Sequence, residues 1–135
     1  MKIIALKGGN SCGKSTTLNL VYDELIRRGG TSTPRVVIGN PSHNDFECIV
    51  TYLSKTIGFY TMGDYSGYTI NAIKKYASIP VDILILATND RFVKPTIEIS
   101  KYPNNILTKT IATPVNIANN MIANQTDCAT IISLI

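Results

Sequence analysis

The sequence has little of what a secreted, membrane-spanning or metal-chelating protein needs. It contains one histidine, His43, and three cysteines, whose spacing matches no zinc-binding motif. The longest apolar run, Ile83–Ala87, is far shorter than the ~20 residues of a membrane span. The first residues include no apolar stretch as long as the ~7–15 residues of a secretory signal. We therefore expect a reduced, cytoplasmic protein with no membrane contact.

Charge is also sparse. Charged residues make up 16% of the chain, and 13 basic against 9 acidic residues leave a formal net charge of +4. The basic residues are scattered, with only Arg27-Arg28 and Lys74-Lys75 as pairs, so we expect no nucleic-acid partner. Hydrophobic residues reach 44%, which excludes a disordered chain. The length of 135 residues predicts a single domain, residues 1–135.

Strand-like and helix-like segments alternate along the chain. The apolar run Lys2–Lys7 predicts a buried strand, and Leu18, Val21 and Leu25 recur at helical spacing before Gly29-Gly30. Residues 31–45 are predicted to form a long loop, with a short strand at Val36–Ile38 as an alternative. Further strands are expected at Phe46–Tyr52, Thr56–Met62, Val81–Thr88, Ile106–Ala112 and Cys128–Ile135, and helices around Ile70–Ala77, Phe92–Tyr102 and Pro114–Gln125. This alternation predicts an α/β three-layer sandwich, with a mainly parallel sheet that contains one antiparallel hairpin strand.

One segment carries a specific chemical pattern. Residues Gly8–Ser15 fit G-x-x-x-x-G-K-[ST], between the first predicted strand and the first predicted helix. Glycines allow consecutive backbone N–H groups to turn inward toward a phosphate, and the helix that follows adds the positive end of its dipole. Lys14 can place its ammonium on the β- and γ-phosphates, and the Ser15 hydroxyl can ligate Mg²⁺. The alternative is a plain glycine-rich turn, which the strand and helix on either side disfavour.

With Gly8, Gly13, Lys14 and Ser15, the chain resembles the P-loop NTPase superfamily. The resemblance implies the P-loop NTPase fold, a nucleoside triphosphate, ATP or GTP, as ligand, and Mg²⁺ as cofactor. It also implies that the whole loop binds the nucleotide. The residues concerned are Gly8, Gly9, Asn10, Ser11, Cys12, Gly13, Lys14, Ser15 and Thr16.

A second motif, Asp64-Tyr65-Ser66-Gly67, follows the predicted hairpin and fits D-x-x-G. In GTPase-like P-loop proteins such an aspartate holds Mg²⁺ through water, and the glycine N–H meets the γ-phosphate. The resemblance thus implies that Asp64 is a metal-binding and catalytic residue, like Lys14, and that Gly67 contacts the nucleotide. The alternative is that Asp64 merely caps a helix. Asp82 is a rival carboxylate, but it begins its strand, at the end away from ligands in α/β sheets.

The chain departs from the GTPase pattern at two places. Tyr68 stands where many GTPases have the glutamine that orients the attacking water, so we expect slow hydrolysis or dependence on a protein partner or activator. Asn89 fits the first position of the guanine motif N-K-x-D, but Asp90 is no lysine, which favours ATP slightly over GTP. Both residues are candidates for the base or substrate pocket, and an ordinary turn is the alternative. Arg35 and Arg91 are candidates for an arginine finger.

Three functions fit these observations. The first is a Mg²⁺-dependent nucleoside triphosphatase. The second is a small-molecule or nucleoside kinase, which the absence of an arginine-rich lid segment disfavours. The third is a non-catalytic nucleotide-binding module that docks on a larger protein. The motifs favour the first.

Overall fold

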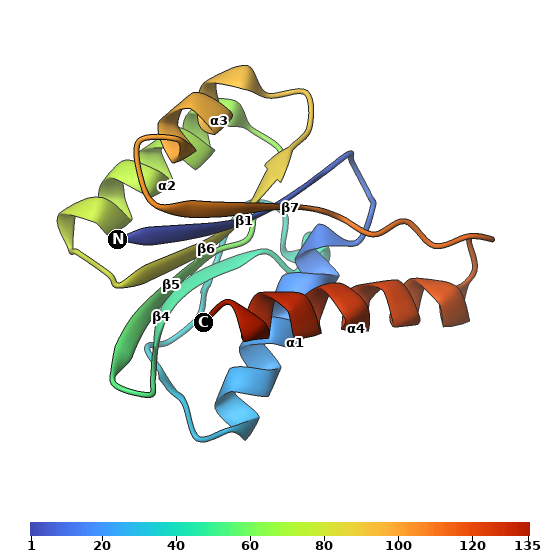
Figure 1. Cartoon of the computed structure of the whole chain (residues 1–135), viewed down its shortest axis with the longest axis horizontal. Coiled ribbons are helices and arrows are strands. Elements are labelled where there is room, and N and C mark those ends of the chain that lie inside the picture. The colour runs from blue at the N-terminus through green and yellow to red at the C-terminus, as the bar shows by residue number, and fades with distance from the viewer.

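A seven-stranded sheet runs through the middle of the molecule, with helices on both of its faces (Figure 1). The computed structural model describes residues 1–135. The strands are β1 (Lys2–Gly8), β2 (Thr31–Ser32), β3 (Val36–Val37), β4 (Phe46–Tyr52), β5 (Lys55–Tyr60), β6 (Ile83–Asn89) and β7 (Asn104–Thr108). The helices are α1 (Lys14–Arg27), α2 (Ser66–Ser78), α3 (Val93–Ile99) and α4 (Ile117–Ser133), with a 3₁₀ turn at Pro41–His43. None of these helices combines the length and apolar character that crossing a membrane requires.

The sheet is mixed, so the expectation of a mainly parallel sheet with one antiparallel strand is wrong. Its order is β2-β4-β5-β6-β1-β7, and β3 also pairs with β4. The pairs β5–β6, β6–β1 and β1–β7 are parallel, whereas β2, β3 and β5 all pair antiparallel with β4. The difference arises because the expected loop, residues 31–45, supplies two short strands that pair antiparallel with β4, one of them at the alternative strand position Val36–Ile38.

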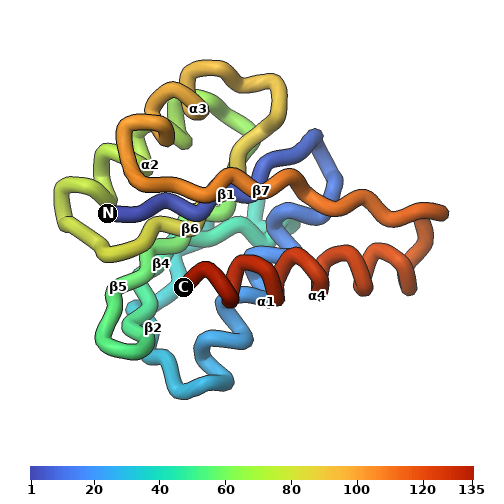
Figure 2. Tube along the Cα trace, in the orientation of Figure 1, coloured from blue at the N-terminus to red at the C-terminus, as the bar shows by residue number.

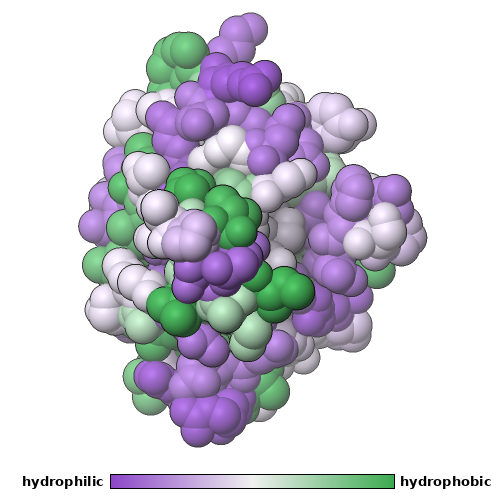
Figure 3. Space-filling model, turned by 90° about the vertical axis from the view of Figure 1, so that its right-hand side faces the viewer, coloured by the Kyte–Doolittle hydropathy of each residue, from purple (hydrophilic) through white to green (hydrophobic).

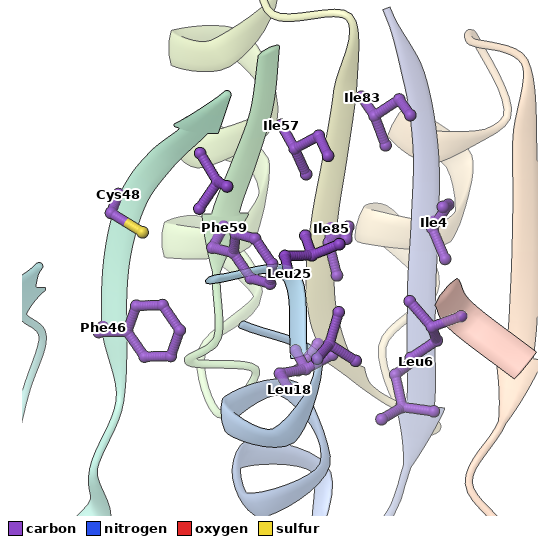
Figure 4. Packing of buried hydrophobic residues seen from close by; sticks show 14 residues of the cluster. Ile4, Leu6, Leu18, Leu25, Phe46, Cys48, Ile57, Phe59, Ile83 and Ile85 are labelled. Carbon is purple, nitrogen blue, oxygen red and sulfur yellow. The ribbon is translucent and has the colours of Figure 1, made fainter. Parts of the chain in front are cut away.

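Two apolar layers hold the helices on the sheet. Leu18 and Leu25 of α1 pack against strand residues such as Ile85 (Figure 4). A second buried cluster, which includes Ile73 of α2 and Ile99 of α3, covers the opposite face. Because the middle of β1 and of β6 is buried on both faces, the residues there are apolar, which explains the unbroken hydrophobic runs Ile3–Leu6 and Ile83–Ala87.

The structure confirms most of the expected elements but not the last one. The hairpin forms as β4 and β5, in antiparallel register from Glu47–Tyr60 to Tyr52–Lys55. The strand expected at Cys128–Ile135 is wrong, because α4 continues to Ser133. Ala123, Asp127 and Ile131 lie four residues apart and are buried along one face of this helix. Burial of that face outweighs the strand preference of the branched residues near the end of the chain.

The topology gathers several chain segments at one edge of the sheet. The parallel strands β1, β5 and β6 end there, and β4 begins there because it runs antiparallel to β5. The loops that follow β1 and β7 also leave the sheet toward the same end of the molecule (Figure 2). Ligands of open α/β sheets bind at this edge, so it is the place to look for a site.

Candidate functional site

The loop between β1 and α1 has a backbone that demands glycine. Ser11 and Gly13 both have positive φ, 55° and 94°. A Cβ at Gly13 would lie 2.8 Å from Oδ1 of Asn124, and one at Gly8 would lie 2.7 Å from Sγ of Cys12. A side chain at Gly8 or Gly13 would therefore crowd Cys12 or Asn124 respectively, in addition to the backbone strain at Gly13.

The backbone donors of this loop are unpaired. No backbone N–H from residue 9 to residue 16 donates a hydrogen bond to another protein atom, and the first main-chain bond of α1 runs from Thr17 N to Gly13 O at 2.9 Å. The first N–H groups of a helix cannot find partners within it, and they carry the positive end of the helix dipole. Consecutive free N–H groups at this point form a site suited to an anion.

Lys14 adds a full positive charge to these donors. Its Nζ lies 2.9 Å from Gly8 O and 2.6 Å from Gly9 O, and 3.9 Å from the Cys12 sulfur. The residue is only 7% exposed and forms no ion pair with a carboxylate. The ammonium is thus held across the loop by carbonyl groups alone, and its charge is not neutralised within the protein.

Asp45 is a site residue that the sequence reasoning missed. Its Oδ1 accepts hydrogen bonds from Ser15 Oγ at 2.6 Å and from Thr61 Oγ1 at 2.9 Å, and the residue is 4% exposed. Thr61 Oγ1 in turn accepts from the N–H of Phe46 at 3.0 Å, which fixes the hydroxyl. The available signal was that Asp45 directly precedes the first strand of the hairpin, whose start lies at the same edge as the end of β1.

These groups face a cavity of about 660 Å³, within the range of small-molecule sites. Residues 10–16 form one wall, and Asp45, Asp64, Thr61, His43 and Tyr65 contribute to the others. One ligand atom each of His43, Asp45 and Asp64 lies within 4.8 Å of the other two. The cavity therefore combines two kinds of groups. Hydrogen-bond donors suited to an anion lie on one side, and two carboxylates, the ligands that hard divalent cations prefer, lie on the other.

Most of the remaining predicted residues lie outside the lining of this cavity. Asp64 lines it, but Gly67 and Asp90 do not. Asn89 is 4% exposed, and its Nδ2 donates to Asn10 Oδ1 at 2.7 Å. Asn89 thus positions the loop from the end of β6, and its side chain lines neither of the two cavities next to the loop.

The rival carboxylate and the arginine candidates have structural contacts instead. Asp82 lies at the opposite edge of the sheet, where hydrogen bonds from the backbone N–H and the hydroxyl of Thr56 lower the pKa of its carboxyl. The guanidinium of Arg35 lies 3.7 Å from the ring centroid of Phe46. Arg91 is exposed and forms no ion pair. No arginine lines the cavity.

A buried ion pair joins Lys109, which follows β7, to Asp127 of α4. Lys109 Nζ lies 2.9 Å from Asp127 Oδ2, with side chains only 1% and 9% exposed. Asp127 also accepts hydrogen bonds from the backbone N–H and the hydroxyl of Thr110. Burial opposes ionisation of Asp127, but the hydrogen bonds from Thr110 and Lys109 outweigh it and hold its pKa below the ordinary value. This pair joins the end of β7 to α4.

Comparison with known proteins gave no match to a family model, a curated protein or a solved structure. The assignment of a function therefore depends on the motif, the geometry of the loop and the chemistry of the cavity beside it.

Proposed function

We propose that this protein binds a nucleoside triphosphate with Mg²⁺ in the 660 Å³ cavity and hydrolyses its β–γ bond slowly. One observation carries the proposal: the backbone N–H groups of residues 9–16 are all unpaired and surround a buried lysine that has no carboxylate partner. Unpaired donors of this number are costly unless water or an anion satisfies them. The resemblance of Gly8–Ser15 to the P-loop indicates which anion that is.

Binding of the phosphates would use donors that already exist. The N–H groups would donate to the α- and β-phosphate oxygens, and Lys14 would exchange its contacts with Gly8 O and Gly9 O for oxygens of the β- and γ-phosphates. The carbonyl contacts hold the ammonium close to the loop, so little side-chain ordering is required. This preorganisation favours tight binding because the entropy of positioning the charge is lost during folding.

The metal would be held opposite Lys14. Mg²⁺ prefers oxygen ligands and is bound in such sites by the loop serine, one or two carboxylates and the phosphates. Ser15 Oγ, Asp45 and Asp64 supply these oxygens. Asp45 Oδ1 orients the Ser15 hydroxyl, whereas its Oδ2 accepts no hydrogen bond from the protein and remains available. Bound Mg²⁺ would neutralise charge that develops on the phosphates during transfer.

The cavity lacks the residues that make hydrolysis fast. Hydrolysis needs a water that attacks the γ-phosphorus while the bond to the bridging oxygen breaks and the diphosphate leaves. Neither a glutamine that would orient this water nor an arginine lines the cavity. Since an arginine finger alone accelerates the reaction about 10³–10⁵-fold, we expect turnover on the order of 10⁻³ s⁻¹ or slower without a partner. Small kinases use arginines to hold the transferred phosphate, so the absence of arginine from the lining also disfavours a kinase.

Calorimetric titration of MgATP tests the proposal, with phosphate release measured separately. Lys14→Ala is expected to weaken binding at least tenfold and to abolish phosphate release, because Lys14 is the only lysine or arginine that lines the cavity. Lys74→Ala is the matched control, because Lys74 is exposed on α2 and does not line the cavity. Absence of binding by the wild type would overturn the proposal. Binding without any release of phosphate would instead identify a non-catalytic nucleotide-binding module.

A further inference from the structure

A second cavity, of about 460 Å³, lies on the other side of the phosphate-binding loop. The two cavities share the loop residues 10–13 and Thr16, so a ligand held by the loop can extend from one into the other. The outer walls of the second cavity come from the segment between β7 and α4 and from the first turns of α4. Figure 3 shows this end of the molecule, where hydrophobic side chains lie among hydrophilic ones.

The lining of this cavity suits a flat group with apolar faces and a polar edge. Ile111, Val115 and Ala123 provide apolar walls, and Asn120 and Asn124 provide two amides. The two asparagines lie four residues apart on α4 and so face the same side of the helix. We propose that this cavity binds the adenine base of the nucleotide, with Asn120 and Asn124 as the residues that determine base preference. The inference rests on the proposed function, because it requires the phosphates to occupy the loop.

The hydrogen bonds of the two amides specify what they can recognise. Asn124 Oδ1 accepts from Thr17 Oγ1 at 3.2 Å, which fixes the orientation of this amide and leaves its Nδ2 to donate. The side chain of Asn120 has no partner in the protein and can both donate and accept. Adenine offers a ring nitrogen that accepts beside an amino group that donates, and asparagine amides match that pattern.

The same cavity lacks what guanine would need. Guanine presents adjacent N–H donors on its pairing edge, and a free carboxylate is the acceptor that binds both. No acidic residue lines the cavity. The buried carboxylate of α4, Asp127, already accepts from Lys109 and from both donors of Thr110. The proposal therefore assigns base recognition to α4 rather than to Asn89 and Asp90, neither of which lines either cavity.

Titrations of ATP, GTP and inorganic tripolyphosphate, each with Mg²⁺, separate the base from the phosphates. We expect the wild type to bind ATP at least tenfold more tightly than GTP or tripolyphosphate. Asn120→Ala is expected to weaken ATP binding about tenfold, as the loss of one or two hydrogen bonds predicts, and to leave tripolyphosphate binding unchanged. Gln125→Ala is the matched control, because Gln125 lies on α4 outside this cavity.

A second variant tests specificity rather than affinity. Asn120→Asp places a carboxylate where guanine could donate two hydrogen bonds, and is expected to lower the ATP-to-GTP preference at least tenfold. Equal binding of ATP, GTP and tripolyphosphate by the wild type would overturn the inference while leaving the phosphate site intact. An unchanged preference in both Asn120 variants would also overturn it. Failure of all three ligands to bind would refute the proposed function itself.

Discussion

Replacement of Asp45 by asparagine separates its structural role from its proposed role at the metal. The carboxylate is buried, and a single oxygen, Oδ1, accepts both the Ser15 and the Thr61 hydroxyl groups. Asparagine keeps an oxygen at this position and replaces the other oxygen by an amide nitrogen, which cannot ligate a cation. Asp45→Ala, in contrast, removes the acceptor of both hydroxyl groups.

The magnitudes follow from these two hydrogen bonds. A bond to a charged acceptor contributes about 1.5–3 kcal/mol and a neutral one about 0.5–1.5 kcal/mol. Asp45→Asn should therefore lower the free energy of unfolding by about 2 kcal/mol, and Asp45→Ala by about 4 kcal/mol. For a domain of this size each kcal/mol lowers Tm by about 4 °C, so the decreases should be about 8 °C and 16 °C.

Thermal unfolding and ATP titration with and without Mg²⁺ measure the two roles. Asp45→Asn is expected to fold. In this variant the factor by which Mg²⁺ increases ATP affinity should be at least tenfold smaller than in the wild type. Asp64→Asn should lose part of this increase without loss of stability, because Asp64 is exposed and forms no hydrogen bond. Asp23→Asn, an exposed change on α1, is the control for charge. Full Mg²⁺ dependence in Asp45→Asn would refute the assignment of this residue to the metal.

Two other features lead to separate expectations. Gly13→Ala should lower the free energy of unfolding by about 1–3 kcal/mol and abolish ATP binding, because φ is 94° and the added Cβ would lie 2.8 Å from Asn124. Gly9→Ala is the control and should unfold like the wild type, because no atom lies within 4 Å of its added Cβ. Asp127→Asn should cost about 3 kcal/mol at pH 7 in chemical denaturation, because Lys109 would remain buried and charged without its partner. Folding lowers the pKa of Asp127, so its contribution to stability is present above the ordinary value of 3.8 and is lost as the pH falls through the folded pKa. The difference in unfolding free energy between wild type and variant should therefore shrink on acidification. A difference that grew below pH 4 would contradict this ion-pair account.

The loop itself was predictable from the sequence because its geometry is local. A buried strand, glycines at positions that need them and an amphipathic helix all lie within the first 27 residues. The hairpin was predictable for the same reason, since β4 and β5 are separated by only two residues, Leu53 and Ser54. In both cases neighbouring residues determine the conformation, and no distant pairing is required.

The contact between the Asp45 carboxylate and Ser15 was not predictable, because it depends on pairing between distant segments. Asp45 lies 30 residues from Ser15 in the chain, and only the antiparallel direction of β4 brings the two together. The mixed sheet escaped prediction for a related reason, because β2 and β3 are two residues long and gain their strand conformation from β4. The apolar residues Val36–Ile38 allowed a short strand at β3 but not its pairing with β4, and the polar pair Thr31-Ser32 gave no indication of β2.

The end of the chain was mispredicted because its local preference and its packing disagree. Ile131 and Ile132 favour a strand, yet Ile131 is fully buried as part of a helical face that begins at Ala123. The helix starts after Asn116, whose side chain accepts a hydrogen bond from the N–H of Asn119. With the start set by this cap, the spacing of four residues between buried positions continues through the segment.

The most direct test of the proposed phosphate site is a residue-by-residue measurement of the backbone amides of residues 9–16. In an ¹H–¹⁵N NMR titration with Mg²⁺ and tripolyphosphate, the amides of residues 9–16 should show the largest chemical-shift changes, because these N–H groups have no partner in the protein. The same titration of Lys14→Ala should show much weaker changes at equal ligand concentration. Changes confined to other parts of the chain, or none at saturating ligand, would contradict the assignment of this loop to polyphosphate.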